Sequence, residues 1–170
     1  MKKNLLFIVF VFLACSGFAQ EKTVKDIFTR FEGKEGINVI NLDKDMLGAF
    51  IPQDSANANL KGITEQITAL KIMIFEKASA EDKASFAKQA KEFALPNFRT
   101  FLAKENNQEV KILLKETGNK ITEFIIFAYE GKDLALISII GNMDNKVLDE
   151  IKNKMHLGEV KLTEESPKTK

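Results

Sequence analysis

The stretch "ITEFIIFAYEGKDLALISII" (residues 121–140) decides the fold, because it holds two apolar runs separated by a short polar turn. The runs, "ITEFIIFAY" (121–129) and "LALISII" (134–140), are rich in β-branched and aromatic residues, as strands are. A third segment with alternating apolar residues at 110–114 comes just before them, and a Gly-Asn pair supplies the intervening turn. We therefore predict a three-strand antiparallel meander in this part of the chain.

Apolar spacing in the rest of the chain predicts helices and two further strands. Residues 24–31 carry an amphipathic stripe, and Ser79 begins the longest helix, whose buried stripe contains Phe86 and Phe93. Pro96 interrupts that helix, and a second helical piece is expected to follow it. The second piece carries Phe98, Phe101 and Leu102. We expect strands at 37–42 and 69–75, and a short helix that is capped by Asp43 and presents Met46, Leu47, Phe50 and Ile51. A weaker helix is expected at 60–67, and a last helix, capped by Asn142 or Asp144, is expected to run through Met155.

Together these elements predict a single α+β domain. We expect one mixed sheet of about five strands that ends in the three-strand antiparallel meander, with helices packed on at least one face. The runs at 121–129 and 134–140 are apolar on both faces, whereas a sheet with one wet face would alternate. Either helices cover both faces, or a second copy, a partner or an apolar ligand covers one of them.

The first 19 residues have the three parts of a secretory signal. A positive start precedes an apolar run of about ten residues, which is too short for the roughly 20 that span a bilayer. Cleavage after Ala19 would leave a chain that starts at Gln20, whereas cleavage before Cys15 would leave a thiol that can carry lipid. We therefore predict a signal peptide over 1–19, a domain over 20–156 and a polar, disordered tail over 157–170. The expected location is periplasmic or secreted, with a lipoprotein anchored through Cys15 as the alternative.

Composition argues against several classes of function. Loss of the two lysines in the leader moves the formal net charge from +1 to about −1. A chain with this charge lacks the excess of positive charge that is typical of nucleic-acid-binding proteins. A membrane contact is expected only if Cys15 is lipidated. The single histidine, His156, lies near the end of the chain, so a Ser-His-Asp or Cys-His arrangement and a zinc site lack the residues they need. We predict no metal, no cofactor and no enzymatic activity.

Carboxylates are the remaining candidates for catalysis. Asp43 is simplest as a helix cap, and Asp149 with Glu150 is simplest as a solvated helix face. Glu123 is less ordinary, because it stands in an otherwise apolar strand. It is either a solvent-side residue near the start of the strand or, if it faces a pocket, a carboxyl with a raised pKa that could act as a general acid.

Three stretches resemble a secreted family of Bacteroidota, domain of unknown function 4252. They are "IFTRFEGKEGINVINLDKDML" (27–47), "LKIMIF" (70–75) and "LALISIIGNMD" (134–144), and the leader ending "FAQ" is also similar. The resemblance covers roughly residues 22–156 and assigns no catalytic residue. It implies a small domain exported to the cell envelope, sometimes encoded near extracytoplasmic sigma-factor systems, which hints at envelope stress or regulation.

Three functions remain as hypotheses. The first is a non-enzymatic envelope or periplasmic binding module that self-associates or binds an envelope protein. Its candidate contact residues are Phe124, Ile126, Leu136 and Ser138. The second is a carrier of a small apolar ligand in a pocket between sheet and helices. The third is a carboxylate-dependent enzyme that uses Glu123.

Overall fold

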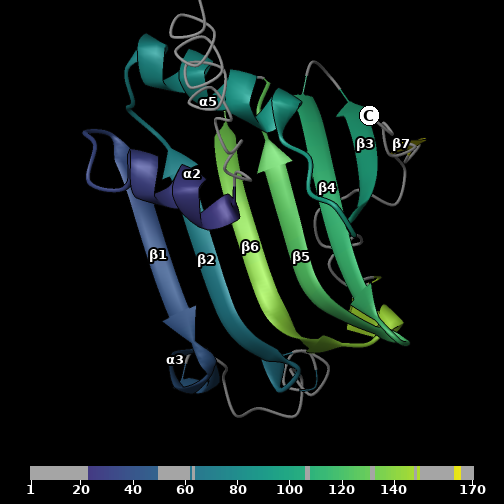
Figure 1. The fold of residues 1–170 in the computed structure, drawn as a ribbon. Coiled ribbons are helices and arrows are strands. Elements are labelled where there is room, and N and C mark those ends of the chain that lie inside the picture. Colours follow the sequence, from purple (N-terminus) through teal and green to yellow (C-terminus); the bar gives the residue numbers. More distant parts are fainter. Residues whose placement is uncertain are drawn as a thin grey trace, which may run out of the picture.

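A single antiparallel sheet forms the centre of the protein, with its strands in the order β1-β2-β6-β5-β4-β3-β7 (Figure 1). The computed structural model describes residues 23–49, 62, 64–105, 108–130, 133–147, 149 and 163–165. The strands are β1 Ile37–Asp43, β2 Ile67–Phe75, β3 Arg99–Glu105, β4 Gln108–Thr117, β5 Lys120–Ala128, β6 Leu134–Met143 and β7 Thr163–Glu165. The helices are α2 Val24–Phe31, α3 Lys44–Ala49 and α5 Ala80–Glu92.

The sheet differs from the predicted one in size and in direction. It has six long strands instead of about five, together with the short β7, and every neighbouring pair is antiparallel instead of mixed. The α+β class and the antiparallel meander β4-β5-β6 are confirmed, and β3 extends the meander by one strand. Helix α5 accounts for the order of the strands, because it carries the chain from β2 over one face to β3 near the other edge (Figure 1).

The second helical piece predicted after Pro96 is wrong, because this segment forms β3. Asn97 has a φ of 65°, which turns the chain out of the helical direction directly after the proline. Phe101 then lies opposite Ile112 of β4, where the two side chains contribute to one apolar surface.

Two other segments differ from their predictions. In the segment predicted as a disordered tail, residues 163–165 form β7 against β3, whose outer edge would otherwise present unpaired backbone groups. In the weaker helix predicted at 60–67, Gly62 and Thr64 are helical, but Ile67 already belongs to β2.

Helix α2 forms as its apolar spacing predicts. The Thr23 hydroxyl accepts a hydrogen bond from the Asp26 amide, and the Asp26 carboxylate accepts one from the Thr23 amide, which makes a reciprocal capping box. The helix ends before Gly33 and Gly36, whose φ angles of 82° and 74° lie in the left-handed region. The inward residues of α2 are Val24, Ile27, Phe28 and Phe31, all of which are buried.

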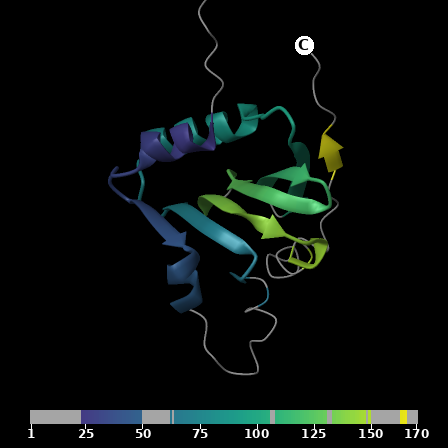
Figure 2. The same ribbon diagram turned by 60° about the horizontal axis from the view of Figure 1, so that its bottom comes forward.

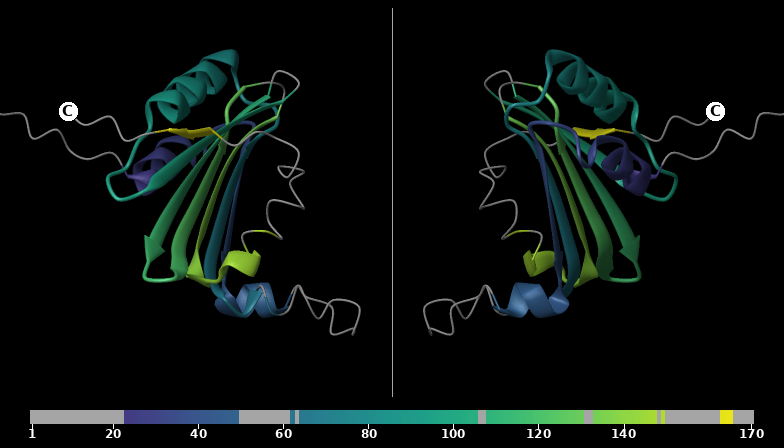
Figure 3. Two further views of the ribbon diagram at one scale, coloured as in Figure 1. Left: turned by 90° about the vertical axis from the view of Figure 1, so that its right-hand side faces the viewer. Right: turned by 90° about the vertical axis from the view of Figure 1, so that its left-hand side faces the viewer.

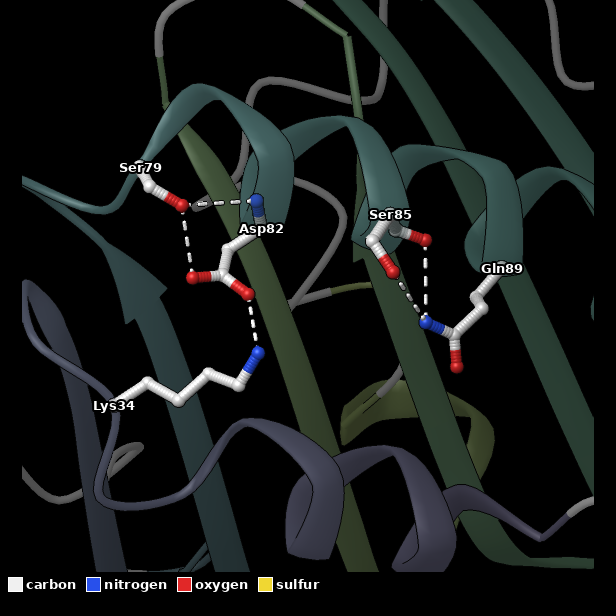
Figure 4. Close-up of polar contacts among 5 residues, drawn as sticks. All are labelled: Lys34, Ser79, Asp82, Ser85 and Gln89. Atoms are coloured by element: carbon white, nitrogen blue, oxygen red, sulfur yellow. Dashed lines mark hydrogen bonds and ion pairs between the residues drawn. The ribbon is translucent and has the colours of Figure 1, made fainter.

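Helix α5 begins where the sequence predicts and is tied to the turn after α2. The Ser79 hydroxyl accepts a hydrogen bond from the Asp82 amide at 3.1 Å and donates one to the Asp82 carboxylate at 2.9 Å (Figure 4). The Lys34 ammonium forms an ion pair with the other oxygen of Asp82. This contact, together with Ser79, holds the pKa of Asp82 below its ordinary value. The Gln89 amide donates to Ser85 one turn earlier along α5 (Figure 4).

Helices α2 and α5 cover one face of the sheet, here called the helix face (Figure 2). Buried side chains of both helices pack there on inward residues of five strands, and phenylalanine rings meet at its centre. The Phe86 ring lies 4.5 Å from Phe75, 5.9 Å from Phe31 and 6.1 Å from Phe127, centre to centre. On the sheet, the helix-face core residues are Ile37, Met73, Phe75, Leu113, Ile125, Phe127, Leu134 and Leu136, and Tyr129 joins them directly after β5.

The other face, here called the opposite face, carries a second apolar cluster. Leu47 of α3 joins it at one end, and Val147 joins it from a helical turn at 145–147, which lies across the sheet from α2 (Figure 3). Asp144, one of the two predicted caps, accepts hydrogen bonds from the amides of Lys146 and Val147. Both faces of the central strands are therefore buried, which explains why 121–129 and 134–140 are apolar on both sides.

Several predictions concern residues outside the described ranges. These are the leader with Cys15, Ala19 and Gln20, the helix residues Phe50 and Ile51, the part of the last helix that ends at Met155, and His156. Among the helices that the structure describes, none has the length and apolar character needed to cross a bilayer.

Candidate functional site: a groove on the helix face

A groove of about 620 Å³ lies on the helix face, where the sheet continues beyond the cover of α2. Its floor is made by the adjoining ends of β1, β2, β6 and β5, and α2 and α3 contribute to its walls. Most of the lining surface is apolar. The lining residues are Val24, Lys25, Phe28, Asn41, Leu42, Asp43, Met46, Ala69, Leu70, Lys71, Glu123, Ser138 and Ile140.

Three polar residues that interrupt apolar strands meet in this groove. Lys71 of β2 lies directly opposite Ser138 of β6, and Glu123 of β5 lies opposite Ile140, two residues further along β6. Because side chains of opposed residues point to the same face of a sheet, the register brings these groups to one end of the helix face. They lie at positions far apart in the sequence but close together in the fold.

A register irregularity separates Glu123 from Ile121, whereas Glu123 keeps the regular alternation with Ile125 and Phe127 of the helix face. The pairing of β5 with β6 shifts between Ile121 and Glu123, two residues that would share a face in a regular strand. Ile121 is consequently buried in the cluster of the opposite face, whereas Glu123 lines the groove. The neighbouring Thr122 donates its hydroxyl to the Lys115 carbonyl at 3.3 Å across β4 and β5.

The basic group on the groove floor is already engaged. The Lys71 ammonium lies 3.3 Å from a carboxylate oxygen of Glu32 and 4.7 Å from the centre of the Phe28 ring, so it has both an ion pair and a cation–π contact. Asp43 is engaged as well, because its carboxylate accepts a hydrogen bond from the Met46 amide at 2.9 Å and caps α3, as predicted. These contacts fix the positions of two charged lining residues.

Glu123 differs from Lys71 and Asp43. Within the described residues its carboxylate has no hydrogen bond and no ion pair, and the side chain is half-buried. Burial raises the pKa of Glu123 above its ordinary value, and the charge of Lys115, its cross-strand neighbour, offsets part of that effect. The groove therefore presents one carboxylate that has no partner among the residues described by the structure, in a largely apolar surface.

The structure places the other predicted site residues differently. Phe124 and Ile126 are 1% and 2% exposed and belong to the opposite face, whereas Leu136 and Ser138 are 0% and 8% exposed and lie on the helix face. These four residues therefore do not form one free surface for a partner. Glu123, whose simpler interpretation was a solvent-side position, faces a groove instead. Cys15, Ala19 and Gln20 lie outside the described ranges.

Several groove residues were not singled out by the sequence. Lys71, Ala69 and Ile140 lie in strands whose pattern indicated burial, and Asn41 appeared only as part of the alternation of β1. A usable signal did exist, because Lys71, Glu123 and Ser138 each break an apolar strand. The register that aligns these three interruptions was needed to identify them as one site.

The chemistry available in the groove is that of binding. Apolar walls can enclose a hydrocarbon or ring system, and Lys71, Glu123 and Ser138 can orient a polar end. In the part of the chain that the structure describes, no three histidine, cysteine, aspartate or glutamate side chains are grouped so that they could hold a metal ion.

Comparison with known proteins gives one match. The model of a family described as a domain of unknown function, DUF4252, matches residues 31–151. Neither a curated protein nor a solved structure matches the chain. The matched region begins in α2 and contains strands β1 to β6, so it includes the groove floor.

Proposed function

The chain belongs to the DUF4252 family, and from that premise we propose that its domain is a non-enzymatic binding module that holds a small amphipathic ligand in the groove of the helix face. The groove itself carries this proposal. Its volume of about 620 Å³ is in the range typical of sites for small molecules. Apolar walls with a few converging polar groups are also typical of such sites, where the polar groups fix the orientation of the ligand.

The strands that form the floor favour binding to a rigid surface. The two central pairs, β2 with β6 and β6 with β5, run in register for most of their length, so the positions of Lys71, Ser138 and Glu123 are set by a hydrogen-bonded sheet. A preorganised floor reduces the entropy that binding must overcome.

We further propose that the domain acts outside the cytoplasm. The positive start, short apolar run and small residues before Gln20 support export with cleavage after Ala19. The intact mass of the protein from its native envelope tests this. A mass that starts at Gln20 is expected, and a mass that starts at Cys15 with added acyl groups would replace release by anchoring.

A groove-filling variant tests the binding proposal. Ala69 lies on the floor, so Ala69→Phe would occupy the groove, whereas Ala84→Phe places the same ring on an exposed position of α5 as a matched control. The probe is the uncharged dye N-phenyl-1-naphthylamine, whose fluorescence rises in an apolar site. We expect saturable binding by the wild type and by Ala84→Phe, and binding at least tenfold weaker by Ala69→Phe.

Two results would overturn the proposal. One is equal binding of the dye by all three proteins, provided that circular dichroism shows all of them folded. The other is the lack of saturable binding by the wild type, both of the dye and of the single-chain amphiphiles described below.

A further inference from the structure

We propose that the groove selects single-chain amphiphiles with an ammonium head, and that the Glu123 carboxylate is the group that recognises this head. The inference rests on the proposed function, because it names the class of ligand that the same groove would take. It starts from the charges that line the groove and asks which of them remain available to a ligand.

The positive charges of the lining are used or lie at the edge. Lys71 is held by Glu32 and by the face of the Phe28 ring, at 3.3 and 4.7 Å. Lys25 is exposed on α2, where solvent and salt screen its charge. The groove therefore lacks a free cation at its floor within the described residues, and an anionic head would meet an unpaired carboxylate.

The negative charges remain available. Glu123 has no partner within the described residues, and Asp43 at the other side of the floor uses one carboxylate oxygen to cap α3. Lys115 faces Glu123 from the neighbouring strand β4, but its ammonium is 5.8 Å from the centre of the Phe98 ring and is exposed. An ammonium head at Glu123 would supply the partner that this carboxylate lacks among the described residues, in a setting where partial burial strengthens the ion pair.

The apolar part of the ligand also has a defined place. Ile140 lies beside Glu123 in the register and is 47% exposed, and Met46 at the α3 wall is 50% exposed. These are two of the three large apolar side chains that stay exposed within the described residues, and both line the groove. A hydrocarbon chain next to the head would cover them.

Displacement of the bound dye by a matched series of ten-carbon chains tests the inference. Decylamine, decanol and decanoate have the same chain and carry a positive, neutral or negative head at pH 7.5. For the wild type we expect decylamine to displace the dye at about tenfold lower concentration than decanol, with decanoate weakest. For Glu123→Gln the preference for decylamine over decanol should disappear, whereas Glu92→Gln, which removes an exposed carboxylate at the end of α5, should keep it.

The pH dependence supplies a second readout. Displacement by decylamine should weaken as the pH falls and Glu123 takes up a proton, whereas displacement by decanol should stay constant. The other charged groups near Glu123 are Lys115 on β4, Lys71 on β2, Asp43 on β1 and Lys25 on α2. Low pH and the Glu123→Gln substitution both remove the charge of Glu123, and this is the one change that the two experiments share. The same loss of preference in both would therefore assign the effect to Glu123.

The outcomes separate the two levels of the proposal. If decylamine and decanol displace the dye equally well from the wild type, or if Glu123→Gln keeps the wild-type preference, the ammonium inference fails while the binding function stands. If no chain displaces the dye and Ala69→Phe has no effect, the binding function fails as well.

Discussion

Replacing Gly36 with alanine tests how the turn after α2 is held against the start of α5. Gly36 has a φ of 74°, and a Cβ atom added there would lie 2.2 Å from the carbonyl carbon of Lys77 and 2.5 Å from the amide nitrogen of Ala78. The Gly36 carbonyl also accepts a hydrogen bond from the Lys77 amide at 3.1 Å. The methyl group would therefore push directly against backbone that cannot rotate away.

Three costs contribute to the expected loss of stability. The left-handed conformation costs a non-glycine residue about 1–2 kcal/mol. Relief of the clash by movement of the backbone costs about 1–3 kcal/mol, as overpacking does elsewhere. Loss of the Lys77–Gly36 hydrogen bond adds about 1 kcal/mol. We expect Gly36→Ala to lower the free energy of unfolding by about 4 kcal/mol and the melting temperature by about 10 °C for a domain of this size.

Gly33 provides the matched control, because it lies in the same turn with a φ of 82° but has nothing within 4 Å of an added Cβ. Gly33→Ala should therefore cost only the conformational part, about 1–2 kcal/mol. Urea unfolding followed by circular dichroism measures both variants. Equal losses for Gly33→Ala and Gly36→Ala would refute the steric argument and show that backbone conformation alone decides the effect.

Three further predictions concern packing and protonation. Phe86→Ala should lower the free energy of unfolding by about 4 kcal/mol in a urea titration, because a fully buried ring with three ring neighbours is lost; a loss below 1 kcal/mol would contradict the packing seen here. Asp82→Asn should destabilise at pH 7, because the folded-state pKa of Asp82 is lowered and its stabilisation is present above the unfolded-state pKa. That difference should vanish as the pH falls through the folded-state pKa, and a pH-independent difference would exclude the charge as its cause. Glu123→Gln should have the opposite sign: the raised folded-state pKa makes the ionised carboxyl unfavourable, so the variant should be more stable at pH 7 and match the wild type at low pH. Melting curves across pH measure this, and a destabilised variant at pH 7 would be inconsistent with an unpaired carboxylate.

The elements that could be predicted are those with strong local signals. The stripe of α2, the Ser79 cap of α5 and the alternation in β4 depend on residues close together in the sequence, and all three are confirmed. Phe98, Phe101 and Leu102 were assigned to a helix because the spacing of three or four residues is compatible with one. Pairing with β4 decided otherwise, and that pairing is a tertiary interaction which overrides local preference.

The residues of the candidate site were harder to predict from the sequence than the elements of the fold. Glu123 could be selected because a charged residue within an apolar strand is unusual. One of its two interpretations placed it in a pocket and predicted a raised pKa for its carboxyl group. Glu123 lies in phase with Ile125 and Phe127 of the helix face, but the sequence does not show that a groove is present at this end of that face. Phe124 and Ile126 were offered as contacts because their strand is apolar on both sides, but the second cluster buries them.

The pairing of β2 with β6 has a consequence for the order in which the protein folds. Strands β3 to β6 are consecutive neighbours, so their contacts close short loops. Strand β2 pairs with β6 across a separation of 59 residues at Phe75 and Leu134 and of 74 residues at Ile67 and Gly141. We expect this seam to close late. The groove floor lies across it, with Ala69 and Lys71 on one side and Ser138 and Ile140 on the other. A bound amphiphile would then contact both strands of the pair that forms last, β2 and β6. It would slow unfolding by holding β1 and β2 to the meander.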